Sequence, residues 1–227
     1  GIFIVFFGFL DDRISLSASI KIICIFFPVF FLIFSGFELK SLGDYEIIGS
    51  LGLGKLSIFF TLLSVGLLIN AYNYTDGIDG LLSSLSIVMI LYIIFLIDNK
   101  NVISLLYFFL IPLIINLLFN VLPSSNNYKI FLGDCGSLFL GFFLSFLIIY
   151  ANIYENIHPS YLIWSCWYPV YDFLYVTFKR IMNKKNFYQP DNNHLHHLIL
   201  IKFKNNHLKT LIMINFINIF VLLVGFQ

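Results

Sequence analysis

The chain has 227 residues, of which 59% are hydrophobic, 19% aromatic and only 11% charged. A soluble domain carries about 25% charged residues, so this composition excludes an ordinary soluble protein. Thirteen Lys and Arg against twelve Asp and Glu leave a net charge of +1, which gives no broad positive field for nucleic acid. The composition therefore predicts an integral membrane protein.

Apolar stretches of spanning length recur along the chain, separated by short polar segments. The first stretch, 1–10, has about half of the ~20 residues that cross a bilayer, so we interpret it as the end of a helix and the chain as truncated at its N-terminus. The expected fold is all-α: one polytopic transmembrane helical bundle over residues 1–227, with about seven full spans after the partial one. The full spans are expected at 18–36, 56–72, 81–97, 102–122, 136–151, 160–178 and 208–226.

The charges are distributed unevenly over the two sides of this predicted bundle. Ten of the thirteen Lys and Arg residues fall on one side, which the positive-inside rule assigns to the cytoplasm. Carboxylates at a membrane boundary are costly unless they are paired, solvated or bound to metal, so acidic residues on this side indicate a site. Seven of the twelve acidic residues lie there, at helix ends beside Gly, Asn and His: Asp11, Asp12, Asp76, Asp79, Asp134, Asp172 and Asp191.

Two adjacent carboxylates, Asp11 and Asp12, end the first apolar stretch and are followed by Arg13. Like charges this close repel, so we expect a metal ion, a lysine or a shared proton to stabilise them. Lys21, at the start of the next span, either contacts phosphate or anchors the helix at the interface. A polar helix end with an Asp–Arg pair is the simpler interpretation of this segment alone.

The segment from Asn70 to Leu81 contains Asn73, Asp76 and Asp79, with a glycine after each aspartate. Asn and Asp offer the hard oxygen ligands that Mg²⁺ prefers, and glycine lets a phosphate approach the backbone closely. A tight Asp-Gly turn between two spans is the alternative, although such a turn does not need the second Asp-Gly pair.

Asp134 stands between Gly133 and Gly136 at the start of a later span. It could bind Mg²⁺ while free backbone N–H groups face a phosphate, or it could simply cap the helix.

The last polar segment carries Asp191, His194, His196 and His197. Three histidines suggest zinc, but no Cys, Glu or fourth ligand accompanies them at a familiar spacing. Binding of a pyrophosphate is therefore favoured, with an incidental His-rich loop as the alternative. All four segments fall on one membrane face, at separate helix ends. His158 and His207 are interpreted as ordinary loop residues.

Together, these segments resemble the polyprenyl-phosphate N-acetylhexosamine-1-phosphate transferases, the multispanning membrane enzymes of glycosyltransferase family 4. The His-x-His-His form, with Asp191 shortly before it, is most similar to the undecaprenyl-phosphate GlcNAc-1-phosphate transferase branch. The resemblance implies that about two N-terminal helices of the family are missing from this chain. The family's motifs occur here in the same order: Asp11-Asp12, Asn73 to Gly80, Gly133 to Ser137, and His194 to His197.

The resemblance also implies a role for each motif residue. It assigns catalysis to Asp11, Asp12 and Asp79. It assigns a metal ion, Mg²⁺ or alternatively Mn²⁺, to Asn73 and Asp134. The residues to which it assigns substrate binding are Lys21, Asp76, Asp191, His194, His196 and His197.

The implied reaction transfers GlcNAc-1-phosphate, or another N-acetylhexosamine-1-phosphate, from a UDP-sugar to undecaprenyl or another polyprenyl phosphate, and releases UMP. Such an enzyme acts on the cytoplasmic face of the bacterial plasma membrane, in the first membrane step of cell-envelope polysaccharide synthesis, for instance of lipopolysaccharide or O-antigen. Its partners are the UDP-N-acetylhexosamine donor, the lipid acceptor and the membrane; a homodimer is left open. A direct and a double displacement both stay open.

Two alternatives come with this prediction. A phospho-MurNAc-pentapeptide translocase of peptidoglycan synthesis belongs to the same family, but that branch typically has three consecutive histidines followed by x-Glu. An ion-coupled transporter would place acidic residues in the middle of its spans and show internal repeats. Here the acidic residues gather at one face and the sequence shows no repeat, which disfavours a transporter.

Overall fold

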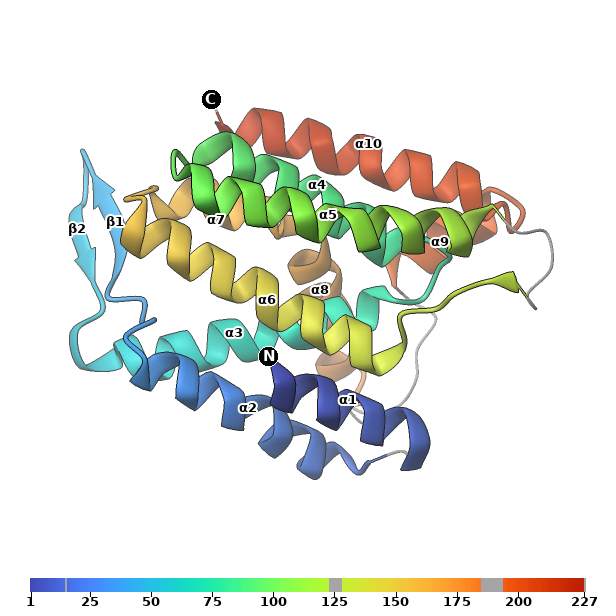
Figure 1. The fold of residues 1–227 in the computed structure, drawn as a ribbon, viewed down its shortest axis with the longest axis horizontal. Coiled ribbons are helices and arrows are strands. Elements are labelled where there is room, and N and C mark those ends of the chain that lie inside the picture. The colour runs from blue at the N-terminus through green and yellow to red at the C-terminus, as the bar shows by residue number, and fades with distance from the viewer. Residues whose placement is uncertain (15, 123–127, 185–193, 227) are drawn as a thin grey trace.

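The computed structural model describes residues 1–14, 16–122, 128–184 and 194–226, and within them it is a helical bundle (Figure 1). The N-terminal half contains α1 (Ile2–Ile14), α2 (Ala18–Phe34), the strands β1 (Ser41–Tyr45) and β2 (Gly49–Gly52), the 3-10 turn η1 (Gly54–Leu56), α3 (Ser57–Thr75) and α4 (Leu81–Leu96). The C-terminal half contains α5 (Lys100–Val121), α6 (Gly133–Tyr154), α7 (Pro159–Ser165), α8 (Trp167–Met182), α9 (Leu195–Lys202) and α10 (His207–Phe226).

Four helices of the described chain are long and apolar enough to cross a membrane: Gly54–Thr75, which joins η1 to α3, and α5, α6 and α10. The helices α2 and α4 are apolar but shorter. Large apolar side chains such as Phe108 on α5 and Phe216 on α10 are exposed, as expected of a surface that faces lipid. The chain is therefore a helical membrane protein, whereas the count of about seven full spans stays a prediction.

The predicted span at 160–178 is instead divided at Cys166, where α7 ends and α8 begins. Pro169 explains the break, because proline has no N–H to donate to the carbonyl of Ser165, four residues earlier. The Ser165 hydroxyl also turns back and donates to the Leu162 carbonyl at 2.6 Å. The break starts a new helix close to Asp172.

The all-α prediction missed the antiparallel hairpin of β1 and β2. Gly43 and Gly49 adopt φ values of +108° and +79°, which glycine tolerates and residues with a Cβ rarely do. Because this segment is rich in glycine and poor in long apolar runs, it cannot continue a spanning helix. The hairpin lies at one end of the bundle (Figure 1).

The helix α6 runs through the middle of the bundle, between α1, α2 and α3 on one side and α4, α5 and α10 on the other (Figure 1). Gly8 of α1 lies against the backbone of Cys135, and a Cβ on Gly141 of α6 would stand 2.6 Å from the Cα of Ile69. Small residues let helices approach this closely in membrane proteins. The two contacts bring the ends of α1 and α3 to the start of α6, away from the hairpin.

Candidate functional site

A lysine lies between two carboxylates where α1, α2 and α6 meet. The Nζ atom of Lys21 is 2.5 Å from Oδ2 of Asp11 and 3.8 Å from Oδ2 of Asp134. Asp11 is buried and also accepts a hydrogen bond from the backbone N–H of Leu16 at 2.8 Å. The predicted stabilisation of Asp11 by a lysine is thus what the structure shows.

Asn73, at the end of α3, holds Asp134 in place. Its Nδ2 atom donates to Oδ1 of Asp134 at 2.9 Å and to the hydroxyl of Ser137 at 2.8 Å. We call Asp11, Lys21, Asn73 and Asp134 the Lys21 cluster. A cavity of about 30 Å³, large enough for water, borders Asp11, Lys21 and Asn73.

Asp12 points to the first turn of α6 and not to Lys21. Its carboxylate accepts hydrogen bonds from the backbone N–H groups of Asp134, at 2.9 Å, and Cys135, at 3.2 Å. A carboxylate is favourable there because helix N-termini carry unpaired N–H groups and a partial positive charge. Gly133 has a φ of +62°, and a Cβ on it would stand 2.9 Å from Oδ2 of Asp12. Asp12 therefore fixes the start of α6, next to Asp134.

Asp76 lies in the turn after α3, near the Lys21 cluster. Its side chain reaches solvent. Desolvation by the surrounding protein, together with the negative charges of Asp134 and Asp12, nevertheless raises the pKa of Asp76 to about 6. Asp76 therefore changes charge near pH 6.

Asp79 is held elsewhere. Its ion-pair partners in the described part of the chain are Lys129, before α6, and His207, whose Nδ1 is 3.2 Å from Oδ2 of Asp79. The catalytic role predicted for Asp79 together with Asp11 and Asp12 stays a prediction, and these contacts place its carboxylate apart from the Lys21 cluster. His207, interpreted from the sequence as an ordinary loop residue, instead helps to tie α10 to the turn before α4.

A second polar group lies between α8 and α9. Asp172 accepts a hydrogen bond from His194 Nδ1 at 2.8 Å and one from the backbone N–H of Leu195 at 2.7 Å. The Nδ1 atom of His196 is 3.5 Å from Oδ2 of Asp172, and all three side chains are buried. We call Asp172, His194 and His196 the histidine cluster.

His197 lies beside the histidine cluster and Asp191 lies outside the described residues. Burial and the neighbouring rings of His196 and His194 lower the pKa of His197, so this side chain is neutral at pH 7. A neutral imidazole can still donate a hydrogen bond to a phosphate oxygen, although it adds no charge to the contact.

The segment after Asn73 connects the two clusters. The ring of Tyr74 stacks on that of His194, with 5.8 Å between the centroids. A Cβ on Gly77 would stand 2.7 Å from Nε2 of His196 and 3.2 Å from Nε2 of His197, so the absence of a side chain lets this turn pack on the histidines. The four sequence segments therefore do converge, but around two centres and a separate Asp79 pair.

Two functional candidates escaped the sequence prediction. Asp172 belongs to the segment that precedes the histidines and to the cytoplasmic acidic residues, but the sequence assigns it no role, and it assigns none to Lys129. The signal for Asp172 was present, because a carboxylate within an apolar stretch needs a partner. Its partners are 22 and 24 positions later in the sequence, at no spacing that a motif would reveal.

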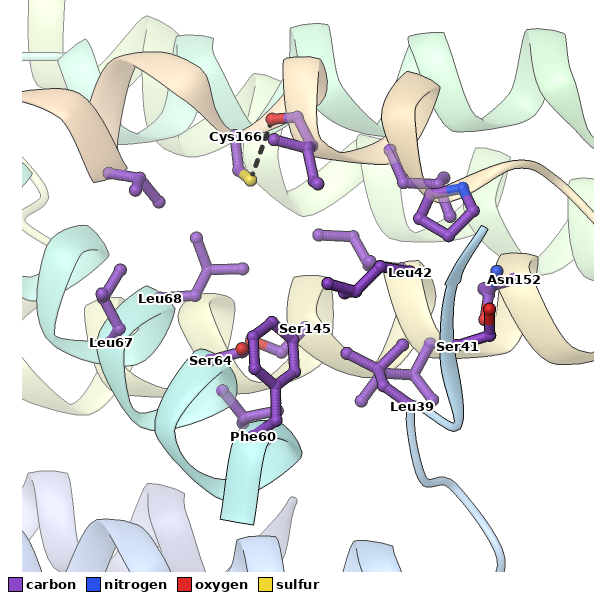
Figure 2. A pocket seen from close by; sticks show the side chains of 17 residues that line it. Leu39, Ser41, Leu42, Phe60, Ser64, Leu67, Leu68, Ser145, Asn152 and Cys166 are labelled. Atoms are coloured by element: carbon purple, nitrogen blue, oxygen red, sulfur yellow. Dashed lines mark hydrogen bonds between the residues drawn. The ribbon is translucent and has the colours of Figure 1, made fainter. Parts of the chain in front are cut away.

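An apolar cavity of about 230 Å³ opens between the hairpin side of α3, α6 and α7 and reaches Val170 on α8. Figure 2 shows Leu42, Phe60 and Leu68 around it, with Ser64 and Ser145 as small polar side chains. Val170 is two positions before Asp172, and Leu68 is five positions before Asn73. These two residues mark the end of the cavity that is directed toward the clusters, whereas Leu42 and Asn152 lie at its hairpin end.

The donor set of the Lys21 cluster fits a hard cation. Mg²⁺ takes one or two carboxylates and fills its remaining positions with water and substrate phosphate oxygens. Asp134 is partly exposed, its Oδ2 lies 3.8 Å from the Lys21 ammonium, and its carboxyl group is also within hydrogen-bonding reach of Asp11. Asn73 now presents Nδ2 to Asp134, so it orients this carboxylate; direct ligation by Asn73 requires its amide to turn.

The fold and the site thus define a helical membrane protein with an acidic, oxygen-rich centre at one end of its bundle. Residues 1–152 match the model of glycosyl transferase family 4, and the chain belongs to this family.

Curated relatives agree with that assignment. The undecaprenyl-phosphate alpha-N-acetylglucosaminyl 1-phosphate transferase of Escherichia coli K12 is 33% identical over 206 residues, which cover 87% of this chain and 55% of the relative. The transferase of the same name from Yersinia pestis is 32% identical over 203 residues, or 87% of this chain and 56% of the relative. A probable undecaprenyl-phosphate N-acetylglucosaminyl 1-phosphate transferase of Bacillus subtilis is 30% identical over 207 residues, with 87% and 55% coverage. The chain spans about half the length of the curated relatives it matches.

Proposed function

We propose that this protein transfers N-acetylglucosamine-1-phosphate from UDP-GlcNAc to undecaprenyl phosphate or a similar polyprenyl phosphate, and releases UMP. The observation that carries the proposal is the Lys21 cluster, where a cation and two carboxylates from three helices meet at one end of a membrane bundle. The names of the relatives support undecaprenyl phosphate as the acceptor and N-acetylglucosamine 1-phosphate as the transferred group.

The reaction brings two phosphate-bearing substrates together. An oxygen of the lipid phosphate attacks the phosphorus that carries the sugar, the bond from this phosphorus to the bridging oxygen breaks, and UMP leaves with the bond's electron pair. Lys21 is placed to hold phosphate oxygens through charge-assisted hydrogen bonds, which are stronger than neutral ones. Its present partners, Asp11 and Asp134, keep the ammonium at the centre of the site.

Asp134 is the residue we propose for binding Mg²⁺, or Mn²⁺ in its place, with Asn73 as its orienting partner. When bound, such an ion supplies charge neutralisation of the pyrophosphate and of the leaving UMP. Asp12, through its bonds to the N–H groups of Asp134 and Cys135, keeps the backbone of Asp134 fixed. Asp76 and His197 stand at the border of this centre as further contacts for the donor.

Asp11 is the carboxylate we propose for the catalytic step. Asp12 is engaged with the first turn of α6 and Asp79 with Lys129 and His207, whereas Asp11 contacts the mobile end of a lysine side chain. When Lys21 turns to a phosphate, Asp11 is free to take the proton of the lipid phosphate. In a double displacement its carboxylate would attack the sugar-bearing phosphorus itself. Both routes are compatible with these contacts.

The apolar cavity is the place we propose for part of the polyprenyl tail. A hydrocarbon chain gains about 25 cal/mol for each Å² that it removes from water, and the walls here are almost entirely apolar. With the tail there, the lipid phosphate points toward the clusters at the inner end. The enzyme would then work at the cytoplasmic face of the bacterial plasma membrane, where positive loops favour it.

A donor comparison tests this proposal. The purified protein in detergent is given undecaprenyl phosphate, Mg²⁺ and either UDP-GlcNAc or UDP-MurNAc-pentapeptide, and UMP release and lipid-linked sugar are measured. We expect transfer from UDP-GlcNAc, and loss of at least about 1,000-fold of that rate in Asp134→Ala because the metal ligand is gone. The exposed hairpin variant Asp44→Ala should keep the wild-type rate. Transfer from the MurNAc donor alone, or full activity of Asp134→Ala, would overturn the proposal.

A further inference from the structure

The histidine cluster has the composition of a transition-metal site. It combines one carboxylate and two imidazoles, whose ligand atoms all lie within 4.8 Å of one another. Asp172 is 1% exposed and His196 is 0% exposed. The three residues come from α8, from the residue before α9 and from α9, so an ion bound here would join two elements.

The distances within the cluster suit a small tetrahedral ion. Oδ2 of Asp172 is 2.8 Å from Nδ1 of His194 and 3.5 Å from Nδ1 of His196. With zinc–ligand bonds of about 2.0 Å, neighbouring ligand atoms of a tetrahedron stand about 3.3 Å apart. These two separations lie on either side of that value and all three ligand atoms lie within 4.8 Å of one another, so the cluster is close to the spacing of a bound ion and has to contract slightly to receive it.

His196 supplies an independent observation. Both of its ring nitrogens are buried, and in the described part of the chain neither makes a hydrogen bond of good geometry, although Nδ1 lies 3.5 Å from Oδ2 of Asp172. Burying a polar group without a hydrogen bond costs free energy, and native proteins rarely contain such groups. The Nε2 edge is closed by Gly77, where a Cβ would stand 2.7 Å away, so Nδ1, on the Asp172 side, is the nitrogen available to an ion.

The carboxylate is also held as a ligand should be. The second oxygen of Asp172, Oδ1, accepts the backbone N–H of Leu195 at 2.7 Å, which leaves Oδ2 between the two imidazoles. Hydrogen bonds of this kind orient the ligands of metal sites and raise their affinity. The sequence argument against zinc was the lack of a further ligand near the histidines, and the fold provides one from α8.

We propose that Asp172, His194 and His196 bind one divalent transition-metal ion, for which Zn²⁺ is the best match. Two imidazoles and a carboxylate suit Zn²⁺, whereas Mg²⁺ takes oxygen ligands, so this site is separate from the one proposed at Asp134. Three protein ligands leave the fourth tetrahedral position to water. The ion fastens α9 to α8 and thereby sets the position of His197 beside Gly77.

Metal analysis of the purified protein tests the site. The protein is prepared in detergent with an affinity tag that contains no histidine, supplied with Zn²⁺, passed over a desalting column and assayed for zinc and iron. We expect about one zinc ion per chain, and zinc affinity at least about 100-fold lower in Asp172→Asn and His196→Ala. The matched control His158→Ala removes a histidine that contacts Ser160 and the Asp44 carbonyl, and it should keep its zinc.

Co²⁺ provides a readout that does not depend on the variants. Bound at this site in place of Zn²⁺, it should give the visible absorption of a tetrahedral ion in the wild-type protein. Zn²⁺ should also raise the melting temperature of the wild type, because a ligand of the folded state stabilises it, and should leave that of Asp172→Asn unchanged. Absence of this absorption in the wild-type protein would overturn the proposal, and so would an equal loss of zinc in His158→Ala. Iron in place of zinc in the purified protein would overturn the choice of Zn²⁺.

Discussion

The Lys21 cluster and the histidine cluster are both built around aspartates, yet these aspartates differ in exposure and in the groups that stabilise their negative charge. In the first, Asp134 is partly exposed and its nearest cation is the side chain of Lys21, itself 42% exposed. In the second, Asp172 is buried and is held by a backbone N–H and an imidazole. Contacts with a flexible exposed lysine can be exchanged for substrate, whereas buried contacts with fixed groups resist exchange.

This difference suggests a division of work within one site. The Lys21 cluster offers oxygen ligands and an exposed lysine, which suit phosphates that must enter and leave the site. The histidine cluster joins α9 to α8 and places His197 next to Gly77. Tyr74 and Gly77 follow Asn73 in the chain and pack on the histidines, so a change in either cluster reaches the other through a few residues.

The first test of this comparison removes the mobile cation. We expect Lys21→Gln to lower kcat/KM by about 10- to 100-fold, because a charge-assisted hydrogen bond to phosphate is lost and Asp11 and Asp134 are left without their shared partner. Steady-state kinetics with each substrate varied in turn measures the effect. Lys40→Gln, at the exposed residue just before β1, serves as the control. An unchanged kcat/KM in Lys21→Gln would remove the lysine from the phosphate site.

A smaller effect is expected from Asp76, which sharpens the comparison through pH. Its raised pKa, about 6, means that the folded protein binds this proton more tightly than the unfolded chain does. The contribution of Asp76 to stability is therefore fully present below its ordinary pKa of 3.8 and is lost as pH rises through about 6. Asp76→Asn carries no charge at any of these pH values, so its stability does not fall as pH rises. Above pH 6 its melting temperature should exceed that of the wild type by about 1–2 °C, a small shift because the side chain is exposed.

Melting curves at pH 5 and pH 7.5 measure this shift. The two proteins should differ less at the lower pH, where the wild-type Asp76 is mostly protonated. A difference that is equal at both pH values would show that Asp76 does not titrate in this range.

Much of this arrangement follows from the sequence. Helix ends at Thr75, Val121 and Phe226 lie within a few residues of those predicted from apolar runs, because lipid-facing helices need long uninterrupted apolar stretches. The meeting of Asp11, Lys21 and Asp134 follows from placing their helix ends on one membrane face. What the sequence could not give is which partner each polar group takes there.

Three differences between the predicted and the observed site show why the partners of polar groups do not follow from the sequence. Asp12 and Asp11 are adjacent, but successive residues of a helix point about 100° apart, so one contacts Lys21 and the other the start of α6. Asp79 follows Asp76 by one helical turn's spacing, yet Lys129 and His207 hold it. Asp172 meets the histidines from α8, the helix that begins after the break at Cys166. Each depends on tertiary packing, which no local pattern records.

The central claim is that the Lys21 cluster, through Asp134, binds the catalytic divalent ion. Electron paramagnetic resonance of Mn²⁺, used in place of Mg²⁺, tests it most directly in the purified protein with UDP-GlcNAc present. Mn²⁺ should bind the wild type and Asp172→Asn alike, while Asp134→Asn should bind it at least about 100-fold more weakly. Equal Mn²⁺ binding by wild type and Asp134→Asn would contradict the claim.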